Sequence, residues 1–126
     1  MPAATIELPW PDARLSPNGR YHWSKVAQAK KAAKRTAHYA VLEAKIGKIE
    51  TDRVVIRYSF HPPDRRLYDL DNLVARMKAA ADGIANALNV NDRIFRPVIN
   101  PLREVVKGGK VVVELTWTDK EETEND

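Results

Sequence analysis

Apolar residues recur at two different spacings along this chain, and this feature limits the fold more than any other. Residues 53–61 and 110–118 place an apolar side chain at every second position, which is typical of strands with one buried face. Residues 25–46 place small apolar side chains three and four positions apart, which is typical of a helix packed closely on a sheet or another helix. That predicted helix face consists of Val26, Ala29, Ala33, Ala37, Ala40 and Ala44. We therefore expect strands and helices in one chain.

Cap and turn residues set the bounds of the predicted helices. Ser24 is expected to cap the first helix, and Gly47 is expected to end it. A second helix is predicted over residues 72–88 as one continuous segment. Its apolar face consists of Leu73, Met77, Ala80, Ile84 and either Ala87 or Leu88.

Two further extended segments complete the expected fold. Residues 5–10 read as a first strand, and residues 94–105 are extended but contain two prolines, which predicts an edge strand or a broken one. A hairpin turn is predicted at residues 107–110. The expected fold is α+β, a single domain over residues 1–118 with the order β-α-β-α-β-β. It has about four strands in a mixed or antiparallel sheet and two main helices.

The net charge of +4 is unevenly distributed. The last eight residues, 119–126, carry −4 and are expected to form a disordered acidic tail, so residues 1–118 carry +8. A basic body favours a polyanionic partner such as a nucleic acid. The absence of cysteine excludes disulfides, thiolate zinc sites, iron–sulfur clusters and cysteine nucleophiles. Without a signal peptide or an apolar run of about 20 residues, the protein is expected to be cytoplasmic and to have no membrane partner.

The richest chemistry lies in residues 64–72. Asp69 and Asp71 are two positions apart in front of the second predicted helix, behind a pair of arginines, and Asp92 follows that helix. Three converging carboxylates make an oxygen-rich site that suits Mg²⁺. On a basic protein such a site suggests phosphodiester hydrolysis. The alternative is that Asp69 or Asp71 only caps the helix and Asp92 is an ordinary turn residue.

A continuous helix would place Asp71, Ala75, Lys78 and Asp82 on one face. Asp82 would then lie about 16 Å along the axis from Asp71, too far to share an ion. We therefore expect Asp82 to be structural and to pair with Lys78 or with an arginine elsewhere. Lys78, about 10 Å from Asp71, would direct its ammonium toward a bound phosphate.

The sequence resembles the RusA family of Holliday-junction resolvases, particularly its phage and prophage members. The main matches are Asp-Leu-Asp-Asn-Leu at residues 69–73, Lys-Ala-Ala-Ala-Asp-Gly-Ile at 78–84 and Val-Asn-Asp at 90–92. Shorter matches follow in chain order, so that the resemblance spans residues 5 to 117. They are Leu-Pro-Trp-Pro at 8–11, Ser-Pro-Asn at 16–18 with Arg20, Pro-Asp-Arg-Arg at 63–66 and Lys-Gly-Gly at 107–109.

The resemblance implies a homodimeric, Mg²⁺-dependent endonuclease that binds four-way DNA junctions and nicks two opposed strands symmetrically in DNA recombination and repair. Mn²⁺ is expected to substitute for Mg²⁺, and no small-molecule cofactor is expected. The catalytic metal ligands that the resemblance implies are Asp69, Asp71 and Asp92. The family also uses a lysine four residues after the second aspartate, where this chain has Ala75, and Lys78 is the candidate one turn later. Asn91 stands where relatives often have a second aspartate.

A resolvase recognises branch shape largely through phosphates, so exposed cations are expected over its DNA-binding surface. The candidate phosphate contacts are Arg14, Arg20, Lys30, Lys31, Lys34, Arg35, Arg65, Arg66 and Arg76. The lysines of the first helix are equally compatible with a solvated face. Tyr21, His22 and Trp23 are expected to pack at the start of that helix, with stacking on an opened junction base as the alternative.

Two other functions remain open at this stage. The first is a module of the same fold that binds branched DNA but has weakened catalysis, which the displaced lysine and Asn91 favour. The second is a basic RNA-binding protein whose aspartates serve only as helix caps.

Overall fold

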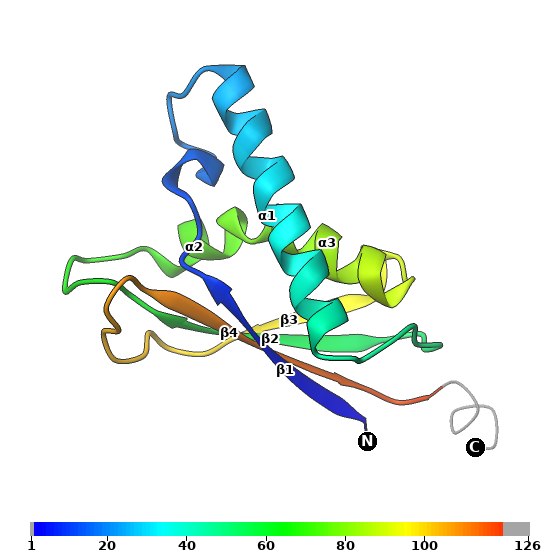
Figure 1. Cartoon of the computed structure of the whole chain (residues 1–126). Coiled ribbons are helices and arrows are strands. Elements are labelled where there is room, and N and C mark those ends of the chain that lie inside the picture. Colours follow the sequence, from blue (N-terminus) through cyan, green and yellow to red (C-terminus); the bar gives the residue numbers. More distant parts are fainter. Residues whose placement is uncertain (1, 120–126) are drawn as a thin grey trace.

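One mixed sheet of four strands organises the computed structural model, which describes residues 2–119 (Figure 1). The strands are β1 (Ala3–Pro9), β2 (Val54–His61), β3 (Phe95–Ile99) and β4 (Lys110–Trp117). Their spatial order is β1-β4-β2-β3, with β4 antiparallel to both neighbours and β3 parallel to β2. The α+β class and the mixed sheet of about four strands are confirmed.

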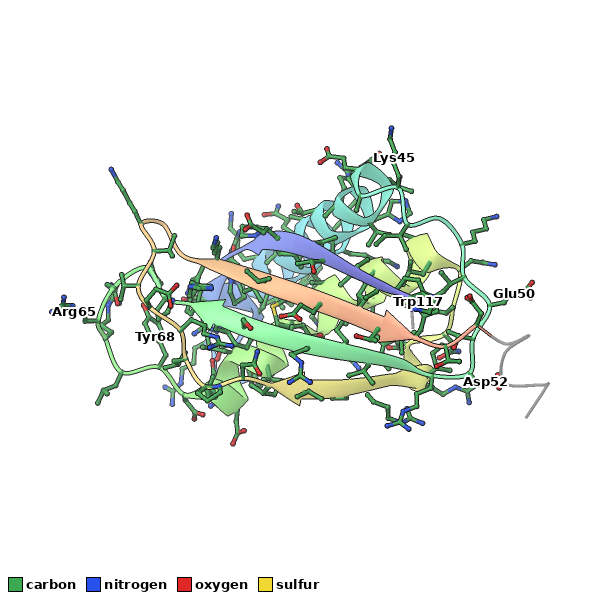
Figure 2. All side chains as sticks on the ribbon, turned by 90° about the horizontal axis from the view of Figure 1, so that it is seen from below. Lys45, Glu50, Asp52, Arg65, Tyr68 and Trp117 are labelled. Carbon is green, nitrogen blue, oxygen red and sulfur yellow. The ribbon has the colours of Figure 1, made fainter. Side chains whose placement is uncertain are left out.

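The sheet buries one face and leaves the other without a covering helix. In Figure 2, which views the sheet from below, the strands lie in front of the helices. The alternation predicted for β2 and β4 is confirmed, because every second residue faces the helices and is buried. These residues are Val54, Ile56, Tyr58, Phe60, Val111, Val113, Leu115 and Trp117.

Small residues allow two helices to pack closely over that buried face. The helices are α1 (Trp23–Glu43), α2 (Leu70–Arg76) and α3 (Lys78–Leu88). Ala29 and Ala37 of the predicted small-residue face are buried, and α1 packs along α3. At Gly83 a Cβ atom would overlap the backbone carbonyl of Lys34. The close packing expected from the small residues is confirmed, and α3 is the helix that makes it.

The second predicted helix is divided into α2 and α3. Met77 lies between them with φ −85° and ψ −3°, and its N–H donates to the carbonyl of Val74, three residues back, at 3.0 Å. This tighter bond closes the last turn of α2 before α3 begins. The prediction of one continuous helix over residues 72–88 is wrong, although Ala75, Lys78 and Asp82 of the face derived from it line one hollow.

The ends of α1 also differ from the prediction. His22, not Ser24, caps the helix, because its ring nitrogen Nδ1 accepts the N–H of Ser24 at 3.2 Å. The helix ends at Glu43, and Lys45 takes the left-handed conformation after it (φ 55°). Gly47 was expected in that role and lies two residues later.

The chain turns at residues 107–110 as predicted, but the turn does not form a hairpin between neighbouring strands. Gly108 and Gly109 have positive φ values of 81° and 71°, so the chain does reverse there. The two strands it connects, β3 and β4, are however not neighbours, because β4 enters the sheet between β1 and β2. A local turn signal cannot reveal which strand a returning chain will pair with.

The expectation of an edge strand is confirmed by β3, although the strand is shorter than residues 94–105. Pro97 lies within it, and an edge position tolerates a residue that donates no backbone hydrogen bond. Beyond β3 the chain still follows β2 and the residues after it. The N–H groups of Asn100 and Arg103 donate to the carbonyls of Tyr58 and Phe60 at 3.0 and 2.9 Å.

Residues 120–126, most of the predicted acidic tail, lie outside the described residues. Within residues 2–119, none of the helices has the length and apolarity that a membrane span requires.

The contact at Gly83 predicts the effect of a single methyl group. Gly83→Ala is expected to lower the free energy of unfolding by about 2–3 kcal/mol, because the new Cβ meets backbone that cannot rotate away. The higher helix propensity of alanine, about 1 kcal/mol, offsets only part of this cost. Urea unfolding measures the difference. Asn86→Ala, at an exposed position of the same helix, is the control and should change stability by less than about 0.5 kcal/mol. Equal stability of the two variants would contradict the close contact.

Candidate functional site

Two exposed carboxylates stand at the start of α2. Asp69 caps the helix, because its Oδ1 accepts the N–H of Asp71 at 2.9 Å. Asp71 follows in the first turn, where the helix dipole favours a negative charge. The capping interpretation is confirmed for Asp69. The cap uses only Oδ1 of Asp69. The other carboxylate oxygens of Asp69 and Asp71 therefore stay available to bind a cation.

The third predicted ligand, Asp92, follows α3. Asn89 adopts a left-handed conformation (φ 61°, ψ 43°) that turns the chain out of the helix. Asn91 then caps the short 3-10 helix η2 (Asp92–Ile94) by accepting the N–H of Arg93 at 2.9 Å. Asp92 is exposed. Asn91, which replaces an acid common in the resembled family, therefore has a structural role here.

Asp82 of α3 lies beside Asp92. Burial raises the pKa of Asp82, and hydrogen bonding to Asp92 and its negative charge raise it further, while the ammonium groups of Lys78 and Lys34 act in the opposite direction. The expected proximity of Lys78 is thus present, but Asp92 affects the pKa of Asp82 more strongly than Lys78 does. Two adjacent carboxylates are stabilised when they share a proton or bind a cation.

The predicted ligands do not form a cage within one chain. Among residues 2–119, no three side chains of His, Cys, Asp or Glu are placed to hold a metal ion. Asp69 and Asp71 lie at the start of α2, whereas Asp92 follows the last turn of α3. The aspartates are suitable oxygen donors for Mg²⁺. The structure brings Asp92 to Asp82 rather than to Asp69 and Asp71, and the metal site stays a prediction.

A basic loop precedes Asp69 and is held in place from within. Asp64 accepts the backbone N–H of Arg66 at 3.0 Å and the hydroxyl of Tyr68 at 2.9 Å, and these bonds lower the pKa of Asp64. The ring of Tyr68 packs edge-on against Trp10 at 5.1 Å. Arg65 is exposed at the end of the molecule, as Figure 2 shows, and Leu67 between the arginine pair and Tyr68 is fully exposed. The loop therefore presents its arginine pair to solvent from a fixed base.

The predicted basic residues of α1 all point to solvent. Exposed cations of this helix and the preceding loop are Arg20, Lys30, Lys31, Lys34 and Arg35. Lys34 lines a hollow of about 230 Å³ together with Asp82 and Asp92. It also lines a second hollow of about 260 Å³ with Lys31 and Arg35. The outer side of α1 therefore combines closely spaced cations with the acid pair of α3 and η2.

Arg66 of the basic loop forms an ion pair with Asp64 at 3.1 Å. Two further candidate arginines are also tied to protein groups. Arg76 donates from Nε to Asn72 Oδ1 at 3.0 Å and from its guanidinium to the carbonyl of Pro11 at 3.3 Å. Arg14 forms an ion pair with Asp12 at 2.7 Å, which lowers the pKa of the Asp12 carboxyl. Both arginines still line a hollow of about 540 Å³, which Lys30 and Lys78 also line.

The packing expected for the aromatic residues at the start of α1 is wrong for Trp23 and Tyr21. The side chain of Trp23 is 76% exposed and that of Tyr21 is 48% exposed, so these rings are not packed under the helix. Their positions in the sequence alone did not reveal this exposure, because aromatic residues at a helix start usually pack against the rest of the protein.

Sequence reasoning missed the contact between Asp82 and Asp92. The two are ten positions apart, and a continuous-helix analysis compares each residue only with others on the helix. The available signal was the pair Asn89 and Asn91, since asparagine tolerates the left-handed conformation that reverses a chain.

Comparison with known proteins found a relative of this chain. An uncharacterized protein of Xylella fastidiosa (strain Temecula1) is 40% identical over 117 residues, which cover 89% of this chain and 75% of that protein. No family model matches the chain.

The acid pair predicts a pH-dependent effect of one substitution in metal-free buffer. Because the pKa of Asp82 is raised above 3.8, the folded protein loses stability as rising pH removes this proton. Asp82→Asn keeps the neutral form and should therefore unfold like the wild type below pH 3.8. Near pH 7 it should be more stable by at most about 1 kcal/mol, since solvent screens a partly exposed pair. Urea unfolding with a chelator, from pH 3 to 8, measures this difference. A variant that is less stable at pH 7 would contradict the like-charge contact.

Proposed function

The chain belongs to the same family as this uncharacterized Xylella fastidiosa protein, and we propose that it is a RusA-type endonuclease. The proposed activity is Mg²⁺-dependent resolution of Holliday junctions by paired symmetric nicks during DNA recombination and repair, carried out by a cytoplasmic homodimer. The relative's name assigns no activity, so the proposal is supported by the residues of this chain and their resemblance to RusA resolvases.

The observation that carries the proposal is a group of four carboxylates along α2, α3 and η2 of a basic protein. Within the described residues, the ion pairs involve Asp12, Glu104, Asp64 and Glu7. Asp69, Asp71, Asp82 and Asp92 take part in none of those ion pairs. Other acids such as Glu43 and Asp52 are also outside those ion pairs, so what distinguishes these four is their grouping, with Asp69 near Asp71 at the start of α2 and Asp82 beside Asp92. Grouped carboxylates are suitable ligands for a cation.

The proposed roles follow from these positions. Asp69, Asp71 and Asp92 would hold Mg²⁺, or Mn²⁺ in its place. Bound metal would activate water and stabilise charge on the phosphate. Lys78, at the first position of α3, is exposed and lies near enough to Asp82 to lower its pKa, so it is suited to contact a phosphate beside the acids. Arg65 and Arg66 flank the start of α2, where they would orient the DNA backbone by contacting adjacent phosphates.

A homodimer serves this chemistry in two ways. Two identical sites related by a two-fold axis would cut opposed strands of a junction symmetrically. In addition, one chain does not gather three acidic or histidine ligands among its described residues. We therefore propose that the second protomer completes each metal site.

The activity is tested with a labelled synthetic four-way junction in Mg²⁺. The wild type should produce paired symmetric nicks, while Asp71→Asn and Asp92→Asn should bind the junction but cut it more than about 100-fold more slowly, since even outer-shell partners of a metal can cost that much. Asp52→Asn, at an exposed turn aspartate, is the matched control and should cut normally. Failure of the wild type to cut any branched DNA in Mg²⁺ or Mn²⁺ would refute the activity.

Mixed dimers test whether the sites are shared between protomers. When Asp71→Asn and Asp92→Asn proteins are unfolded together and refolded as a mixture, shared sites give one intact site in each mixed dimer. The nicking rate should then recover to about a quarter of the wild-type value. If each site lies within one protomer, every site carries one substitution and no activity returns.

One observation favours a second candidate, a module that binds branched DNA without cutting it. The described residues of a single chain form no metal cage, and Ala75 and Asn91 replace residues that resolvases of this type use. Tight junction binding by a pure dimer, with no cleavage in either metal, would support this candidate over the nuclease.

A further inference from the structure

The first residue of α1 is an exposed tryptophan, whereas the other two tryptophans are packed. Trp10 packs edge-on against Phe60 and Tyr68, and Trp117 is 7% exposed in the sheet. Trp23, in contrast, is 76% exposed at the first position of α1, in the part of the helix that lies furthest from the sheet in Figure 1. A single exposed apolar ring is common on protein surfaces, so the surroundings of Trp23 decide whether it is a contact site.

Local interactions hold this ring in a restricted position. Nδ1 of His22 lies 2.7 Å from the hydroxyl oxygen of Ser24, and His22 caps the helix. The imidazole of His22 also lies against the indole of Trp23, with ring centres 5.4 Å apart and planes tilted by 35°. Exposed Tyr21 packs over Gly19, where a Cβ would come within 2.9 Å of the tyrosine ring. The aromatic rings are therefore presented on a structured tip, which reduces the entropy lost on binding.

Cations surround the aromatic tip. Arg20 and Lys25 are exposed on either side of it in the sequence. The loop residues Ser16, Pro17 and Gly19 form one wall of the hollow of about 540 Å³. Lys30, Arg76 and Lys78 line the same hollow with one acid, Asp82, so a chain of phosphates passing the tip would meet a surplus of positive charge. An exposed ring beside a basic groove is the combination that binds unpaired nucleic-acid strands, because every base offers a face for stacking.

We propose that Trp23, supported by Tyr21, is a stacking site for an unpaired base of single-stranded or branched DNA whose backbone lies in this basic hollow. The choice of DNA rests on the proposed function. The surrounding charge favours a polyanion over a second copy of this basic chain or an apolar protein surface. For a resolvase, such a site would hold open the branch point and distinguish a junction from plain duplex.

The test measures binding in Ca²⁺ without cleavage, using fluorescently labelled oligothymidine, a four-way junction and a matched duplex. Trp23→Ala should weaken binding to oligothymidine and to the junction by about 5- to 100-fold, the range of one base–aromatic stack, and duplex binding by less than about twofold. Trp23→Phe should recover most of the affinity. Leu42→Ala, at the other end of α1 and 49% exposed, is the control and should bind like the wild type. Oligothymidine should also quench wild-type tryptophan emission, and Trp23→Phe should lose that quenching.

Unchanged affinities, or an equal loss for all three DNAs, would overturn the stacking site, as would a wild type whose emission oligothymidine does not quench. Sedimentation of Trp23→Ala as a smaller species than the wild type would assign the tryptophan to a protein interface instead. The outcome is separable from the nuclease proposal. Trp23-dependent binding by a protein that never cuts junctions would leave the stacking site in place, and a Trp23→Ala enzyme that binds and cuts normally would remove it alone.

Discussion

The close approach of α3 to α1 is the contact on which the rest of the structure depends. With Gly83 against the carbonyl of Lys34, the two helices lie near enough to cover one face of the sheet with small side chains between them. The same contact places Asp82, the neighbour of Gly83, within the electrostatic reach of Lys34. A packing requirement in the core therefore brings an acid of one helix and a cation of the other together at the surface.

The chain reversal after α3 adds the second acid to this place. The left-handed Asn89 and the cap at Asn91 return the chain along the helix, so that Asp92 meets Asp82. Asp69 and Asp71 are positioned separately, by the cap of α2. The four carboxylates thus form two groups within one chain, each beside exposed cations. This division is the physical reason for proposing that two protomers together make one metal site.

Features that depend on neighbouring residues could be predicted from the sequence. The alternation in β2 and β4, the small residues of α1 and the proline in the edge strand β3 each follow from a local rule, and the structure agrees with all three. Features that depend on the whole chain could not be predicted from the sequence. The break at Met77, the insertion of β4 between β1 and β2 and the contact of Asp82 with Asp92 are decided by tertiary packing. The cap at Asp69 was foreseen only as an alternative to metal binding, yet the carboxylate geometry allows both.

We propose that aspartates from both ends of the α2–α3 segment bind one divalent cation. Titration of the ¹⁵N-labelled protein with Mn²⁺ tests this directly, because the ion broadens the amide signals of residues close to it. The signals of residues 69–72 and 91–93 should broaden together at the same low Mn²⁺ concentration, and excess Mg²⁺ should restore both. Broadening of one group without the other, or of exposed acids elsewhere such as Glu43 before either, would contradict the shared site.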